Sequence, residues 1–237
     1  MNTTTLLQIM RQQQMNWFGS FAAVYHTCMI FLLASVTAVF AITWLANPTM
    51  GAGVFWDGGN AIGFSGFAGL LCLAIASNRP IEMTAHKILG YAVLFVCFLH
   101  AFWFLLGDAA AAEFLKPGAP LYMWSGVLGL VLLGVVVALS LMPDRARVHR
   151  SYRAFRNWHL LLAVATVIAS AYHIIGNDFY ISTKLQAGLL IVLASGVMIG
   201  RQQLRKSFHP TPSSTVQYLT ASIAFGALFV AMRNLTA

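Results

Sequence analysis

Two pairs of histidines with the same spacing are the residues in this sequence best placed to do chemistry. His86 and His100 lie in one long apolar segment, and His159 and His173 lie in another. Fourteen steps of about 100° bring the second side chain of each pair back to within roughly 40° of the first, so both project from one helix face, about 21 Å apart. If the two helices cross a membrane in the same direction, the histidines face each other at two depths.

Two imidazoles that face each other across a helical bundle are what a six-coordinate haem iron needs. A lone histidine in an apolar helix is more often a satisfied core residue. Four histidines in two equal spacings are different, because moving an imidazole from water into hydrocarbon is costly unless the ring is bonded. The residues therefore predict two haem sites, one with His86 and His159 as iron ligands and one with His100 and His173.

Zinc is the competing metal for these histidines. A zinc site gathers three or four ligands in one small polyhedron, whereas the fourteen-residue spacing keeps the two ligands of each helix about 21 Å apart. The spacing thus favours two separate haem centres with two protein ligands each. Each ring should be neutral, with its second nitrogen donating to a backbone carbonyl or a polar side chain.

Three further residues are candidates for cofactor contacts. Gly90 lies four residues after His86 on the same face, where a missing side chain would let a flat macrocycle approach the helix, although helix packing explains a glycine there equally well. Arg153 and Arg156 lie within two turns of His159 and could pair with haem propionates. Their alternative role is topological, because arginines collect on the cytoplasmic side of membrane helices.

The other three histidines are less informative. His26 lies about a third of the way into the first apolar run. It could bond a propionate or a quinone, but a hydrogen-bond donor in the core is the favoured interpretation. His149 lies in an arginine-rich segment and His209 follows the sixth apolar run, so both are expected in solvent.

The composition is typical of a membrane protein. Of the 237 residues, 59% are hydrophobic and 8% are charged, against about 25% charged in soluble domains. The net charge of +8 could suggest nucleic acid, but the basic residues lie between apolar runs, where membrane topology explains them better. Cys28, Cys72 and Cys97 lie inside apolar runs without a CxxC pair, so they predict no disulfide or metal framework.

Seven apolar runs are long enough to cross about 30 Å of hydrocarbon, the last being the weakest. We therefore predict an all-α integral membrane protein, a polytopic bundle of six to seven transmembrane helices with two stacked haem sites. Residues 1–237 should form a single transmembrane domain, including an extra helix at each end of the chain. The runs lie at residues 17–45, 60–77, 84–107, 121–142, 157–176, 182–200 and 216–233.

The basic residues predict the orientation of these helices. With the N-terminus in the cytoplasm, eleven of the 14 lysines and arginines fall inside, and only Lys116, Lys184 and Arg233 fall outside. The third and fifth runs then both start in the cytoplasm, so they run in the same direction. His86 and His159 are expected near the cytoplasmic face of a bacterial-type inner membrane, and the other pair near the outer face.

Two segments of the chain resemble the ferric reductase-like transmembrane domain shared by ferric reductases, NADPH oxidases and the haem-binding membrane subunit of the periplasmic methionine sulfoxide reductase system. These segments are NRP followed by HKILGYAVLFVCFLH, and RNWHLLLAVATVIASAYH, and the similarity covers roughly residues 60–200. The resemblance implies two non-covalent b-type haems that carry single electrons from a cytoplasmic flavin across the membrane. Their ligands would be His86, His100, His159 and His173.

The chain departs from the ferric reductases and NADPH oxidases after residue 200, where it has neither a GxGxxG motif nor α/β periodicity. The expected donor is therefore a separate cytoplasmic flavin reductase or a membrane quinol, so that flavin or quinone acts through a partner. The acceptor would be ferric iron, oxygen or a periplasmic redox protein. Whether an enzymatic activity belongs to this chain or to a partner stays open.

Two alternatives to this general electron-transfer function remain. The first is a dedicated haem-binding membrane subunit of a periplasmic methionine sulfoxide reductase system. The second, from another class, is a haem-free helical scaffold in a larger membrane complex. Lipid is an expected partner in every case, and nucleic acid in none.

Overall fold

The computed structural model describes residues 30–45, 51–75, 80–142 and 151–235. Within these ranges the chain forms helices and no strand, so the predicted all-α class is confirmed there. The helices are Ile30–Trp44, α2 (Val54–Leu73), α3 (Pro80–Gly107), the short 3₁₀ helix η1 (Ala109–Leu115), α4 (Leu121–Leu141), α6 (Tyr152–Ile175), α7 (Lys184–Leu204) and α8 (Pro212–Asn234).

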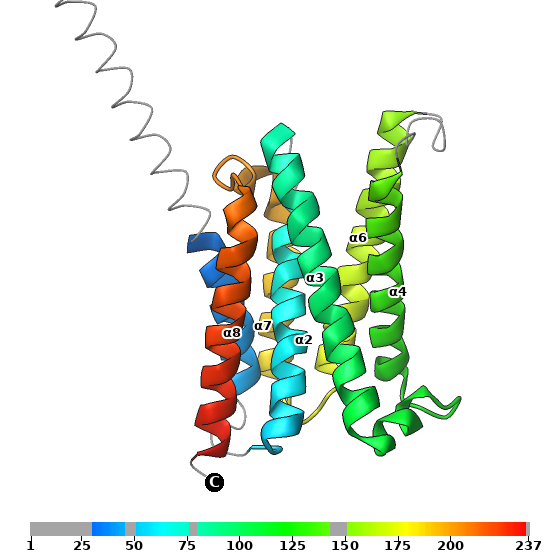
Figure 1. Ribbon diagram of the computed structural model, residues 1–237, viewed down its shortest axis with the longest axis vertical. Coiled ribbons are helices and arrows are strands. Elements are labelled where there is room, and N and C mark those ends of the chain that lie inside the picture. The colour runs from blue at the N-terminus through cyan, green and yellow to red at the C-terminus, as the bar shows by residue number, and fades with distance from the viewer. Residues whose placement is uncertain (1–29, 46–50, 76–79, 143–150, 236–237) are drawn as a thin grey trace, which may run out of the picture.

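The long helices stand side by side in one bundle, and each runs opposite to the long helix before it (Figure 1). We call the end where α3 and α6 begin the upper end and the end where they finish the lower end, as Figure 1 draws them. Helices α3 and α6 descend together from the upper end to the lower end. They therefore run in the same direction, which the predicted histidine pairing requires.

Five of the described helices are long and apolar enough to cross a membrane, namely α3, α4, α6, α7 and α8. The chain is thus a multi-pass membrane protein. The run predicted at 216–233 lies within α8 and meets this criterion, although it was expected to be the weakest. Of the predicted first run, the structure describes only the helix Ile30–Trp44 and the residue after it, and residues 17–29 lie outside the described ranges.

Helix α2 lies at the centre of the bundle and packs against α3, α6, α7 and α8. Twelve of its twenty residues are buried, so it does not depend on lipid to cover its surface. Added Cβ atoms at Gly66 and Gly69 would meet the side chains of Cys97 and Val93 on α3. The glycines therefore let the two helices approach closely, as small residues do in membrane bundles.

Polar side chains set where several helices begin. Ser151 precedes α6 and its hydroxyl accepts a hydrogen bond from the backbone N–H of Ala154 at 3.1 Å. Thr183 precedes α7 and forms a capping box with Gln186. Helix α8 starts with Pro212, whose missing N–H costs nothing at the first helical position. These caps satisfy N–H groups that a helix cannot satisfy by itself.

A buried carboxylate joins three parts of the chain at the lower end. Asp57 on α2 is fully buried, and its Oδ1 accepts hydrogen bonds from the Tyr180 hydroxyl at 2.8 Å and from Arg233 Nε at 3.2 Å. Its Oδ2 accepts from the backbone N–H of Ala52 at 3.1 Å and from Asn234 Nδ2 at 2.8 Å. We call these five residues the Asp57 cluster. They tie α2, α8 and the loop between α6 and α7 together.

Arg233 is also fully buried. Its guanidinium lies 5.1 to 5.2 Å from the ring centroids of Phe179, Tyr180 and Phe229, where cation–π attraction adds to the ion pair. Burial, and then the nearby Asp57 carboxylate, raise the pKa of Tyr180 far above its ordinary value, so this phenol stays a hydrogen-bond donor. Sequence analysis treated Arg233 as a topological charge and did not predict its pairing.

Candidate functional site

The structure brings the four histidines together as two facing pairs. His86 and His159 lie toward the upper end with ring centroids 6.3 Å apart. His100 and His173 lie toward the lower end with ring centroids 6.2 Å apart. We call these the upper pair and the lower pair. In each, one ring comes from α3 and the other from α6.

These separations fit two imidazoles on opposite sides of one metal ion. With a metal–nitrogen bond of about 2.0 Å and a ring centre about 1.1 Å behind the bonding nitrogen, opposed imidazoles place their centroids roughly 6.2 Å apart. In the described ranges, no three His, Cys, Asp or Glu side chains gather where they could hold a metal ion. Each pair therefore suits a group that brings further ligands of its own, as a porphyrin brings four nitrogens.

Backbone carbonyls determine the tautomer of the lower pair. His100 Nδ1 lies 2.7 Å from the carbonyl oxygen of Gly59 on α2, and His173 Nδ1 lies 2.9 Å from that of Tyr122 on α4. A carbonyl oxygen only accepts, so each Nδ1 carries the proton and donates. In a neutral ring this leaves a lone pair on Nε2, the state that a metal ligand needs. The predicted donation to a backbone carbonyl is thus confirmed for these two rings.

The upper pair has one polar contact to a neighbouring helix that can be described. Ser140 Oγ donates to the carbonyl oxygen of Val136 at 2.8 Å and lies 3.5 Å from His159 Nδ1, at the limit of a hydrogen bond. His86 makes no hydrogen bond with any described residue. The His159 ring also lies against the Phe155 ring of the same helix, with ring centroids 5.7 Å apart.

Two glycines make room for the lower pair. An added Cβ would lie 2.7 Å from His100 Cε1 at Gly63 on α2, and 2.7 Å from His173 Nδ1 at Gly126 on α4. These distances are too short for any side chain. The neighbouring helices can therefore lie this close to the rings only because both positions are glycine. Neither residue stands out in the sequence, because glycines are common throughout these helices.

A cavity of about 410 Å³ opens at the upper pair and is lined by both histidines. An adjoining cavity of about 60 Å³ is lined by the same two rings and by Gly90 and Ala163. An added Cβ at Gly90 would meet no atom within 4 Å. Gly90 thus borders open space beside His86, in accord with the place predicted for a cofactor contact. The contact itself stays a prediction.

The two arginines predicted as cofactor contacts differ in position. Arg156 lines the larger cavity, whereas Arg153 is exposed and does not line it. Sequence analysis counted Arg201 and Arg205 only for topology, yet both line this cavity from the end of α7. Their spacing of four residues on one helix face was the signal that could have identified them.

The prediction that His209 lies in solvent is wrong. Its Nδ1 lies 2.9 Å from Glu82 Oε1 on α3, and its side chain is 22% exposed. The turn after α7 brings it against the start of α3, where the nearly buried Glu82 carboxylate needs a partner. His26, His149 and Cys28 lie outside the described residues.

The two described cysteines do not form a disulfide with each other. Cys72 is buried and Cys97 is half-buried. Each lies in the interior of a helix, α2 or α3, where a thiol packs as a small apolar group. Neither contributes to the histidine pairs.

Comparison with known proteins agrees with the histidine-bearing part of the fold. The family described as ferric reductase like transmembrane component matches residues 80–170. This range covers α3, α4 and most of α6, includes three of the four paired histidines, and ends before His173. No curated protein and no solved structure gives a match to this chain. Residues 80–170 are therefore similar to a ferric reductase-like transmembrane domain.

Proposed function

We propose that this chain is a dihaem b-type membrane cytochrome that carries electrons from one side of the bilayer to the other. The observation that supports this most directly is the geometry of the upper and lower pairs, whose centroid separations of 6.3 and 6.2 Å suit one metal ion each. The ferric reductase-like domain independently indicates a redox component of a membrane. Haem, when bound, supplies a one-electron iron couple that the side chains do not have.

The protein would hold one haem between His86 and His159 and the other between His100 and His173. The hydrogen bonds to Gly59 and Tyr122 keep the Nε2 lone pairs of the lower pair available. Gly90 borders open space beside the upper pair, and Gly63 and Gly126 let α2 and α4 pack directly against the rings of the lower pair. Apolar helices surround the rings, and such surroundings lower the local dielectric and would protect a bound redox centre from side reactions.

The charged residues support a cytoplasmic upper end. Among the described residues outside the buried cluster, Lys87, Arg153, Arg156, Arg201, Arg205 and Lys206 lie toward the upper end, and Lys116 and Lys184 toward the lower end. By the positive-inside rule the upper end then faces the cytoplasm. The donor in this proposal is a cytoplasmic flavin reductase or a membrane quinol. The acceptor beyond the lower end is ferric iron, oxygen or a periplasmic redox protein.

A reduced-minus-oxidised spectrum of the purified full-length chain tests the function. We expect a b-type α band and a pyridine haemochrome value of about two haems per chain. A folded, monodisperse protein that shows no α band, even after haem is supplied during expression, would instead be a haem-free scaffold. That outcome rejects the proposed function.

Gly90→Leu should lower the haem content from about two to about one per chain. The leucine would occupy the open space beside His86, and it should leave the fold intact because no atom lies within 4 Å of an added Cβ. The measurement is the pyridine haemochrome ratio at matched protein monodispersity. Gly134→Leu is the matched control, since Gly134 on α4 has equally open surroundings but does not line the cavities. Equal haem contents in the two variants would contradict a cofactor beside Gly90.

A further inference from the structure

The larger cavity at the upper pair is strongly cationic. Lys87 on α3, Arg156 on α6, and Arg201 and Arg205 on α7 all line it, and none of the described lining residues is Asp or Glu. None of the four side chains forms a hydrogen bond or an ion pair with a described residue. Four positive charges around one cavity repel one another, so this arrangement of the described residues favours an anionic ligand.

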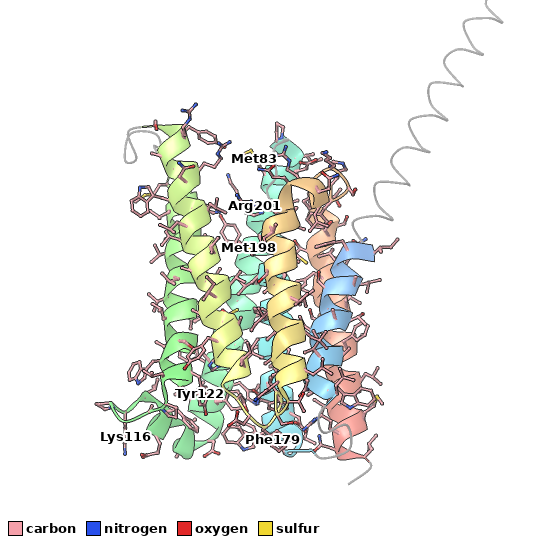
Figure 2. The ribbon with its side chains drawn as sticks, turned by 180° about the vertical axis from the view of Figure 1, so that it is seen from behind. Met83, Lys116, Tyr122, Phe179, Met198 and Arg201 are labelled. Carbon is pink, nitrogen blue, oxygen red and sulfur yellow. The ribbon has the colours of Figure 1, made fainter. Side chains whose placement is uncertain are left out.

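Arg201 and Arg205 are the best placed of the four to bind such a ligand. Both are half-buried, whereas Arg156 is exposed. They lie four residues apart at the end of α7 and therefore share a helix face. Figure 2 shows Arg201 and Met198 on the side of α7 that faces α6, near Met83 of α3. The guanidinium group is planar and binds carboxylates through two parallel N–H bonds, which a lysine cannot do.

We propose that Arg201 and Arg205 bind the two propionate carboxylates of the haem at the upper pair. This assignment rests on the proposed function, and it is supported by the histidines and the arginines lining the same cavity. Haem carries two propionate carboxylates on one edge of its ring, and the arginines that line the cavity could pair with both of them. At the upper end, the cavity supplies two guanidinium groups from α7 that have no ion-pair partner among the described residues.

The proposal has two measurable consequences. Removing both guanidinium groups leaves two carboxylates uncompensated near the iron, which favours the ferric over the ferrous state and lowers the midpoint potential of that haem. It also removes charge-assisted hydrogen bonds, so the dissociation constant of that haem should rise roughly tenfold or more. The haem at the lower pair, about 21 Å further along the helices, should be unchanged.

The test compares Arg201→Gln/Arg205→Gln with the wild type, each purified as the full chain in discs of neutral lipid. Redox titrations followed at the α band should show two components, with only one shifted to lower potential or lost in the variant. Lys206→Gln is the matched control, because Lys206 is an exposed cation at the same end of the bundle and does not line the cavity. Arg201→Lys/Arg205→Lys keeps the charge without the bidentate geometry. Its midpoint potential for the upper haem should lie between those of the wild type and the double Gln variant.

Two components that titrate as in the wild type would overturn the propionate assignment while leaving the proposed function intact. Absence of any α band in the wild type would reject the proposed function itself. Repeating the titrations in anionic lipid tests whether the arginines bind lipid phosphates instead of haem propionates. An effect that appears only there would assign the arginines to lipid phosphates and also overturn the proposal.

A chemical variant of the ligand covers the case in which the double substitution does not fold. Wild-type apoprotein is reconstituted with haem b or with its dimethyl ester, whose propionates carry no charge. The ester should bind the upper pair roughly tenfold or more weakly. Equal retention of the two ligands at both sites would overturn the proposal without any change to the protein.

Discussion

His100→Ala should remove one haem and leave the other in place. The change deletes an Nε2 ligand whose partner, His173, lies on the opposite ring at 6.2 Å. It also frees the carbonyl of Gly59, which now accepts from His100 Nδ1. A six-coordinate haem that loses one of two protein ligands is held poorly. We expect about one haem per chain and the loss of one component from a redox titration.

The pairing itself can be tested by combining substitutions. His173→Ala should lose the same one haem per chain as His100→Ala. The double variant should also lose only one haem, because the two residues serve one centre and their effects are not additive. Adding His86→Ala to His100→Ala should remove both haems. His26→Ala is the control and should retain two haems per chain. Equal haem loss in His26→Ala and His100→Ala would refute the ligand assignment.

Arg233→Leu should destabilise the protein strongly. It would leave the Asp57 carboxylate fully buried without its cation, and breaking one side of a buried ion pair typically costs about 3–5 kcal/mol. The three aromatic rings around the guanidinium would also lose their cation–π contact. We expect a markedly lower thermal unfolding midpoint in detergent, and lower haem retention at the lower pair, because Asp57 lies one half-turn before Gly59.

Two controls separate the lost ion pair from a general loss of packing. Asp57→Asn/Arg233→Leu removes both charges and should recover much of the stability, because no unpaired ion remains. Lys116→Gln breaks an exposed ion pair with Glu113 at the same end of the bundle and should change stability by less than about 1 kcal/mol. An Arg233→Leu protein as stable as the wild type would contradict a structural role for the Asp57 cluster.

Two features of the site were predictable from the sequence because each follows from the pattern of residues along single segments. The spacing of His86 and His100 predicts that they share a face of α3, and the alternation of apolar runs predicts that α3 and α6 run in the same direction. The helical repeat determines the shared face, and the number of membrane crossings determines the common direction. Neither feature depends on which helices are in contact. The membrane class follows in the same way from composition.

The surroundings of each ring were not predictable from the sequence. His100 donates to a carbonyl 41 residues away and His173 to one 51 residues away, and backbone carbonyls are present at every residue, so no residue type marks them. Gly63 and Gly126 differ from neighbouring glycines only in what the opposing helix places against them. The register between helices decides these contacts, and no local pattern encodes that register.

The sequence by itself determined that this is a helical membrane protein with histidines at two depths on two co-directional helices, because turn geometry and hydrocarbon thickness act on each segment separately. Only the tertiary structure decided which side chains surround the histidine pairs. Arg201 and Arg205 reach the cavity of the upper pair, and Asp57 pairs with Arg233 across 176 residues. The physical reason is that burial and charge pairing depend on how all the helices pack together.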